Sequence, residues 1–189
     1  VLAANREVAP QVAEALVELL SAEESDVRFS AAYALRQMVE ANPEVATPQV
    51  AEALLGLLSD KESSVRYSAA YALGEVMEAN SEVAPQVAEA LVGLLTDEDS
   101  DVRSSAADTL GQVVAANPEV ATPQVAEALV ELLTDEDSDV RSSAAYALAQ
   151  VVVANPEIAT PQVAETLLGL LTDKDWSVCY SVVYALGEV

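Results

Sequence analysis

The stretch TPQVAEALVELLTDEDSDVRSSAAYALAQVVVANPE, residues 122–157, is a unit that recurs along the whole chain. A Val-Arg pair opens the second half of each copy and becomes Val-Cys in the last one. The pairs are Val27-Arg28, Val65-Arg66, Val102-Arg103, Val140-Arg141 and Val178-Cys179. The steps between them are 38, 37, 38 and 38 residues. A fixed period in this range is typical of a solenoid, in which each repeat buries its apolar side against its neighbours.

Each unit predicts two helices joined by an acidic turn. The first helix opens at a Thr-Pro pair, Thr122-Pro123 in this copy, where threonine caps and proline fits the first helical position. Two shorter copies carry Ala9-Pro10 and Ala84-Pro85 instead, so weaker caps are expected there. The second helix runs from Val140 to about Ala154. It ends at Asn155-Pro156, where asparagine tolerates a left-handed cap and proline blocks continuation.

Five such hairpins predict an all-α chain of about ten helices in a single solenoid. Residues 1–8 are interpreted as the tail of a preceding second helix, as Val1-Leu2-Ala3-Ala4-Asn5 matches 113–117. The repeats then span 9–45, 46–83, 84–120, 121–158 and 159–189. The last repeat stops in mid-pattern. We therefore expect a piece of a longer array, either natural or a consensus-like design.

The segments 99–103 and 137–141, both Asp-Ser-Asp-Val-Arg followed by an Ala-Ala pair and a leucine, resemble the HEAT-like repeat family. The resemblance covers nearly the whole chain. It implies a right-handed α-solenoid whose second helices line the concave side, and a role in scaffolding and protein binding. One branch of the family resembles the lyases that attach bilins to phycobiliproteins, so a lyase-like enzyme is one alternative.

The composition limits the classes of partner. The net charge of −24, with no histidine, repels nucleic-acid phosphates and anionic lipid head groups, whereas a basic protein or peptide is compatible with it. High acidity also serves solubility alone. The single cysteine, Cys179, offers no internal disulfide and no metal cluster. No apolar run approaches the roughly 20 residues that span a bilayer, and a cytoplasmic location is expected.

The residues for catalysis or for a cofactor are missing. The chain has no histidine, no glycine-rich phosphate loop and no base beside its cysteine, so we expect no enzyme. The acidic turns 97–101 and 135–139 alternate acids as calcium loops do. However, the places that need glycine and glutamate hold Val102 and Asp108, or Val140 and Tyr146. Helix capping explains these acids without a metal.

Four arginines occupy equivalent places and make up half of the basic residues: Arg28, Arg66, Arg103 and Arg141. They could grip a carboxylate-rich tail of a partner. A repeated ion-pair ladder with the acidic turns of adjacent repeats explains them more simply.

The copies differ mainly on one face of the second helix, at three places per repeat. The first place holds Phe29, Tyr67, Ser104, Ser142 and Tyr180; the second Tyr33, Tyr71, Asp108, Tyr146 and Tyr184; the third Arg36, Gly74, Gly111, Ala149 and Gly187. Seven of the eight aromatic residues lie here, and exposed aromatic patches are typical of interaction sites. We predict a partner-binding face in which the small third-place residues leave room for a bound segment. Surface drift, or tyrosines that stack between repeats and stiffen the array, are the alternatives.

The fifth copy departs most from the others, with Trp176, Cys179 and Val182-Val183. These larger apolar groups either cover the end of the stack or contact a further segment. The sequence thus favours a non-enzymatic scaffold that binds a peptide or protein through the second-helix face. End-to-end self-assembly of the array is a second hypothesis, since uncapped solenoid ends expose apolar faces.

Overall fold

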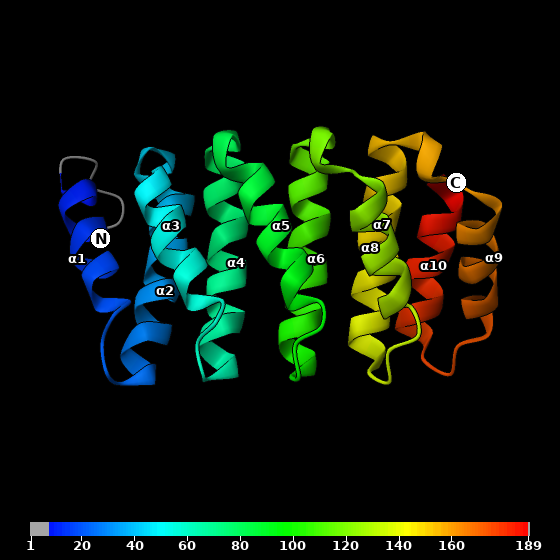
Figure 1. Ribbon diagram of the computed structural model, residues 1–189, viewed down its shortest axis with the longest axis horizontal. Helices are drawn as coiled ribbons and strands as arrows, with labels where there is room; N and C mark the ends of the chain where they lie inside the picture. Colours follow the sequence, from blue (N-terminus) through cyan, green and yellow to red (C-terminus); the bar gives the residue numbers. More distant parts are fainter. Residues whose placement is uncertain (1–7, 189) are drawn as a thin grey trace. The chain divides into compact units, whose positions relative to one another are not determined.

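The computed structural model describes residues 8–188, which hold ten α-helices and no strand (Figure 1). None of these helices is both long and apolar enough to cross a bilayer. The chain divides into two compact units, residues 1–90 and 91–189, with the division inside α5 (Ala84–Leu94). Each unit is described by itself.

The first unit is built from two helical hairpins and the start of α5. Its helices are α1 (Ala9–Leu19), α2 (Ser25–Ala41), α3 (Pro48–Leu57) and α4 (Ser63–Ala79), with 3-10 turns η1 (Pro43–Val45) and η2 (Ser81–Val83). The second helices α2 and α4 lie side by side (Figure 1). Leu35, Leu54 and Leu73 are fully buried between the two layers of helices. Burial of such side chains stabilises the stack by about 2 kcal/mol each.

The second unit continues the pattern from the end of α5. It contains α6 (Ser100–Ala116), η3 (Pro118–Val120), α7 (Pro123–Leu132), α8 (Ser138–Ala154), η4 (Pro156–Ile158), α9 (Pro161–Gly169), η5 (Leu170–Thr172) and α10 (Trp176–Glu188). Helix α8 packs against both α6 and α10. The core holds Leu110, Leu129, Leu148 and Leu167.

The predicted helical hairpins are confirmed. Each repeat span from 9–45 to 159–189 contains two α-helices and a 3-10 turn. Residues 1–7 of the expected helix tail lie outside the described residues. That all five repeats form one continuous array stays a prediction.

The threonine caps are also confirmed. The hydroxyl oxygens of Thr47, Thr122 and Thr160 accept a hydrogen bond from the backbone N–H three residues on, at 3.3 Å in each case. This satisfies one of the orphan donors at a helix start. Helix α1, which lacks the threonine, has no side-chain cap bond at Val8.

The expected left-handed asparagine cap is wrong. No residue in the described part of the chain has a positive φ, and Asn155 has φ −139° and ψ 88°. Its side chain is used within the repeat instead: Nδ2 donates to the carbonyl of Ala121 at 3.1 Å, while Oδ1 accepts from the N–H of Glu157. Asn80 donates to Ala46 in the same way, at 2.9 Å. The amide thus ties the end of the second helix to the segment that precedes the first helix of the same repeat.

Candidate functional site

The arginines at the start of the second helices occupy equivalent places in their repeats, two in each unit, and are together called the arginine edge: Arg28, Arg66, Arg103 and Arg141. Three of them make a bidentate ion pair with an aspartate 32 residues later, in the turn of the next repeat. Nε and Nη2 donate to the two carboxylate oxygens over 2.6 and 2.8 Å for Arg28–Asp60, 2.8 and 2.9 Å for Arg103–Asp135, and 2.8 Å twice for Arg141–Asp173. This planar fork geometry is one that lysine cannot reproduce.

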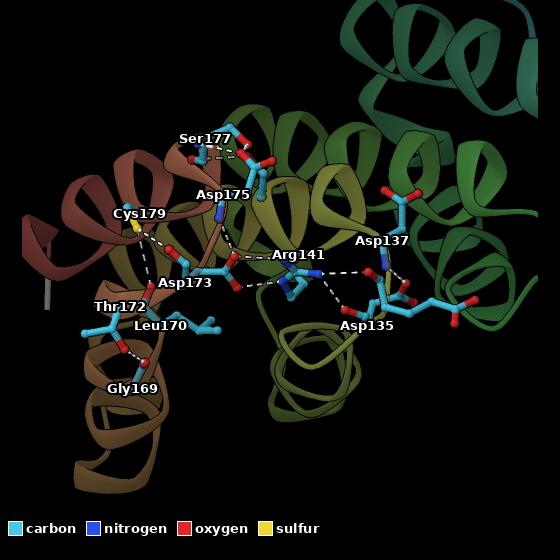
Figure 2. Close-up of polar contacts among 12 residues, drawn as sticks. Asp135, Asp137, Arg141, Gly169, Leu170, Thr172, Asp173, Asp175, Ser177 and Cys179 are labelled. Carbon is cyan, nitrogen blue, oxygen red and sulfur yellow. Dashed lines mark hydrogen bonds and ion pairs between the residues drawn. The ribbon is translucent and has the colours of Figure 1, made fainter.

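Each arginine also binds its own turn through Nη1. Arg141 donates to the carbonyl oxygens of Asp135 and Glu136 at 2.8 and 3.1 Å, and Figure 2 shows it between Asp135 and Asp173. Arg66 donates to the carbonyl of Asp60 at 2.8 Å. One guanidinium therefore ties the turn of its own repeat to another turn.

The ion pairs fix the charges of both partners. Hydrogen bonds from Arg141 and from the backbone N–H of Asp175 lower the pKa of the Asp173 carboxyl, and the hydrogen bond from Arg28 does the same for Asp60. Burial acts to raise the pKa of Asp135, yet the bonds from Arg103 and from the Asp137 N–H outweigh it and the pKa is lowered. The aspartates of the edge are thus carboxylates across the neutral range.

Cys179 stands where the fifth arginine would be. Its Sγ lies 3.5 Å from the carbonyl oxygens of Leu171 and Asp173. Figure 2 shows it beside Asp173. The thiol thus occupies the place of Nη1 at its own turn, as a weak donor only. Unlike arginine, it has no further donor groups that could bind the turn of a neighbouring repeat.

The acidic turns cap the second helices, as expected. Asp99 accepts from the N–H groups of Asp101 and Val102, and Asp137 accepts from that of Asp139. Among residues 8–188, no three His, Cys, Asp or Glu side chains are grouped to hold a metal ion.

In each unit, the residues at the first and second places of the second helices are here called the aromatic face. Most of its rings are exposed: Tyr33 by 52%, Tyr146 by 39% and Tyr180 by 70%, with Phe29, Tyr67 and Tyr184 in the same range. Tyr71 is half-buried. Rings left in water on an otherwise packed helix are the feature expected of an interaction surface.

Some of these rings contact one another. Tyr67 and Tyr71 meet edge to face with centroids 4.9 Å apart, and Tyr146 stacks on Tyr184 at 5.7 Å. The second pair joins equivalent places of adjacent repeats, which fits the alternative in which tyrosines stiffen the array. Such pairs stabilise by about 1 kcal/mol.

The two serines of the first place are used between helices. Ser104 Oγ lies 3.1 Å from Ser143 Oγ, and Ser142 Oγ lies 2.9 Å from Ser181 Oγ. Both side chains are half-buried. Their hydroxyls therefore join neighbouring second helices, which gives them a packing role that the sequence comparison missed.

The third place does not leave the expected room. Gly74, Gly111 and Ala149 are buried, and a Cβ added at Gly111 would lie 3.0 Å from the Cα of Ala147. Helix α8 already fills the space beside Gly111, because the missing side chain lets the two helices approach closely. Only Gly187 is exposed among these small residues.

Arg36, the remaining third-place residue, is engaged within the first unit. Its guanidinium lies 5.3 Å from the centroid of the Tyr71 ring, and its Nε donates to Glu75 Oε1 at 3.3 Å. Glu75 was not expected in this role. In the sequence this acidic residue lies 39 positions after the basic one. That relation can be recognised only when the register of neighbouring helices is known.

Asp108 replaces a tyrosine in the middle of the aromatic face. Its half-buried carboxylate accepts a hydrogen bond from Gln112 Nε2 at 3.2 Å and forms no ion pair with a described lysine or arginine. Burial raises the pKa of this carboxyl. The pKa values of the aspartates of the arginine edge are shifted in the opposite direction, to lower values.

Comparison with known proteins supports this fold. Residues 6–189 match the family model described as "Sister chromatid cohesion protein PDS5 protein". No curated protein sequence matches the chain. The expected HEAT-like resemblance is thereby confirmed, and the chain is an all-α solenoid of two-helix repeats.

Solved structures show the same architecture. An engineered protein is 30% identical with a TM-score of 0.78, over 99% of this chain and 85% of that one. A second engineered protein is 30% identical with a TM-score of 0.74, over 99% of this chain and 51% of that one. A designed armadillo repeat protein in complex with the peptide (KR)4 has a TM-score of 0.72 at 22% identity, over 99% of this chain and 88% of that one. At that identity the likeness shows the fold alone.

Proposed function

Because the chain belongs to the family of the sister chromatid cohesion protein PDS5 protein, we propose that it is a non-enzymatic scaffold that binds a protein or peptide through its aromatic face. A repeat solenoid is typical of protein-interaction scaffolds, and such families are generally non-enzymatic.

The observation that most directly supports this proposal is the exposure of aromatic rings along one side of the second helices. In the first unit α2 and α4 present Phe29, Tyr33 and Tyr67, and in the second unit α8 and α10 present Tyr146 and Tyr180. Aromatic side chains lose little conformational entropy when they are covered and supply large contact areas. A partner that covers them removes apolar surface that the fold alone leaves in water.

The charge favours a basic partner. The chain carries a net charge of −24, so a cationic segment is attracted and an anionic one is repelled. A designed armadillo repeat protein with the same fold was solved with the peptide (KR)4, which is a fold-level precedent for an extended basic ligand.

The same charge bears on the family description, which refers to sister chromatid cohesion. Binding to DNA phosphates requires cations that release counterions, and this chain has 8 basic residues against 32 acidic ones. Its contribution to such an assembly would therefore be a contact with protein.

The test is a peptide selected from a random displayed library on the wild-type chain, with its affinity then measured by fluorescence anisotropy. The variant Tyr33→Ala/Tyr67→Ala/Tyr146→Ala/Tyr180→Ala should bind on the order of tenfold or more weakly, since each ring contributes contact area. Its helical circular dichroism should stay unchanged.

Matched controls are Leu19→Ala and Leu168→Ala, two exposed apolar residues on first helices. These should bind the selected peptide like the wild type. Unchanged affinity in the quadruple variant, or equal losses in the controls, would show that the aromatic face is not the binding surface.

Self-assembly is the second candidate, supported by the apolar surface at α9 and α10. Trp176 is 78% exposed and Val183 60%, and Leu168 and Leu171 are exposed as well. Contacts between unlike surfaces that do not close produce filaments. Light scattering that rises steeply with concentration, and falls in Trp176→Glu/Val183→Glu, would support this function. A constant molar mass would exclude it.

A further inference from the structure

The first unit contains an internal cation-binding arrangement on its aromatic face. Arg36 of α2 lies over the ring of Tyr71 on α4, 5.3 Å from its centroid, and pairs with Glu75 at 3.3 Å. A ring face and a carboxylate thus hold one guanidinium, in the manner of a cation–π site. The Arg36 side chain is 34% exposed, so the arrangement lies at the surface.

In the second unit the same ring lacks this arginine. The spacing of 35 residues from Arg36 to Tyr71 recurs from Gly111 on α6 to Tyr146 on α8, so a glycine takes the place of the arginine. Tyr146 is exposed, whereas Tyr71 is half-buried. The second unit therefore has the tyrosine ring, Tyr146, but a glycine at the place where the first unit has Arg36.

The second unit does supply an acid at this point. Asp108 lies one turn before Gly111, and Gly111 is the residue at which α6 touches Ala147, the neighbour of Tyr146. Equivalent second places of adjacent repeats lie close enough to stack, as Tyr146 and Tyr184 do at 5.7 Å. Asp108 holds that second place on α6, one repeat before Tyr146 on α8.

The state of Asp108 points in the same direction. Its carboxylate is half-buried with Gln112 as its hydrogen-bond partner and without an ion pair in the described residues, an arrangement that costs free energy. A charged group kept in an unfavourable place on a surface of aromatic rings is typical of a site that a ligand completes.

We infer that Asp108 and Tyr146 form a subsite that takes an arginine or lysine side chain of a bound basic peptide. The peptide's cation lies on the exposed part of the Tyr146 ring, and Asp108 supplies the carboxylate, since Gln150 takes the place of Glu75 in this repeat. This inference rests on the proposed function, because it assigns one contact within the same face.

The experiment is a calorimetric titration of the intact chain with the peptide (KR)4 at low ionic strength. Asp108→Asn keeps the shape and the hydrogen bond from Gln112 but removes the charge. It should weaken binding on the order of tenfold, as expected for the loss of a charge-assisted hydrogen bond. Tyr146→Ala should weaken it similarly, and Tyr146→Phe should not.

The matched control is Asp139→Asn, which removes one charge from an exposed turn. It should change the affinity by less than about twofold, because surface charges contribute little. Equal losses in both aspartate variants would mean attraction by net charge alone and would overturn the subsite. Absence of (KR)4 binding to the wild type would overturn it as well.

The two proposals fail in distinguishable ways. If the library-selected peptide loses affinity in the quadruple tyrosine variant while Asp108→Asn leaves (KR)4 binding unchanged, the aromatic face binds a partner but the subsite is wrong. If the affinity of the selected peptide is unchanged in the quadruple tyrosine variant, the proposed function itself is wrong. Circular dichroism of Asp108→Asn checks that a loss of affinity is not a loss of fold.

Discussion

The arginine edge and the aromatic face lie on the same second helices and treat charge in opposite ways. At the edge, Arg141 and Asp173 satisfy each other with two hydrogen bonds of 2.8 Å, and both side chains are over 90% buried. On the face, Asp108 is half-buried without a cation of its own and rings stay in water. The constant arginines thus stabilise contacts between turns, whereas the variable places combine packing contacts, such as that of Ser142 with Ser181, with the unfavourable burial of Asp108, which we propose that a partner relieves.

The largest expected effect is the loss of an edge ion pair. Arg141→Ala leaves the Asp173 carboxylate buried without its cation and removes the clamp on the Asp135 and Glu136 carbonyls. We expect a loss of about 3 kcal/mol in the free energy of unfolding, typical of breaking a buried pair from one side. Urea denaturation at neutral pH measures it.

The matched control for this loss is Cys179→Ala, in the same helical register one repeat later. Its thiol makes only weak contacts to backbone carbonyls, so the change should stay within about 0.5 kcal/mol. Equal effects at the two positions would mean that the edge contributes through packing and not through its ion pairs.

Acid should selectively weaken the edge. The pKa values of Asp60, Asp135 and Asp173 are lower in the folded chain than in the unfolded one. Their stabilisation is therefore complete above the unfolded pKa of about 4 and is lost as the pH falls through the folded values. Urea midpoints from pH 6 down to acid should fall less in Arg141→Ala, which has already lost one pair. Parallel curves would contradict this assignment.

A smaller effect separates two helical glycines. Gly111→Ala puts a Cβ 3.0 Å from the Ala147 backbone, and overpacking of about 2 kcal/mol exceeds the gain of about 1 kcal/mol in helix propensity. The net change is a loss of about 1 kcal/mol. Gly56→Ala on α3 meets no atom within 4 Å, so the same substitution should stabilise there. Thermal unfolding with the same sign at both positions would refute the close approach of α6 and α8.

Much of the fold could be predicted because it depends on local signals that recur along the chain. The Thr-Pro starts, the acidic turns and the 38-residue period each follow from residue chemistry, and the helices begin and end near the expected positions. The asparagine cap was wrong because its side chain bonds to a carbonyl at the far end of the same repeat. Ala121 lies 34 residues before Asn155, and no local pattern relates them.

The candidate site was less predictable, because spacing gives the face of a helix but not its neighbours. Variation at Gly111 and Ser142 was interpreted as open surface, whereas the structure places both against adjacent second helices. Tyr33 and Tyr146 remain largely exposed, although Tyr146 also stacks on Tyr184 of the adjacent second helix. What separates these cases is the distance between helices, which depends on the smallest residue at each crossing.

The smallest expected effect on stability has the opposite sign to all the edge substitutions. Burial raises the pKa of the Asp108 carboxyl, so this carboxyl binds its proton more strongly in the folded chain than in the unfolded one. At neutral pH the carboxylate form therefore destabilises the fold. Asp108→Asn should therefore raise the urea midpoint slightly at pH 7. The gain should shrink as the pH falls below the folded pKa and vanish below the unfolded one, the reverse of the trend for Asp173. A variant that both gains stability and loses affinity for (KR)4 would show that the unfavourable charge of Asp108 contributes to binding. A loss of stability at pH 7 would mean that its bond to Gln112 outweighs the burial, and Asp108 would then resemble the aspartates of the arginine edge.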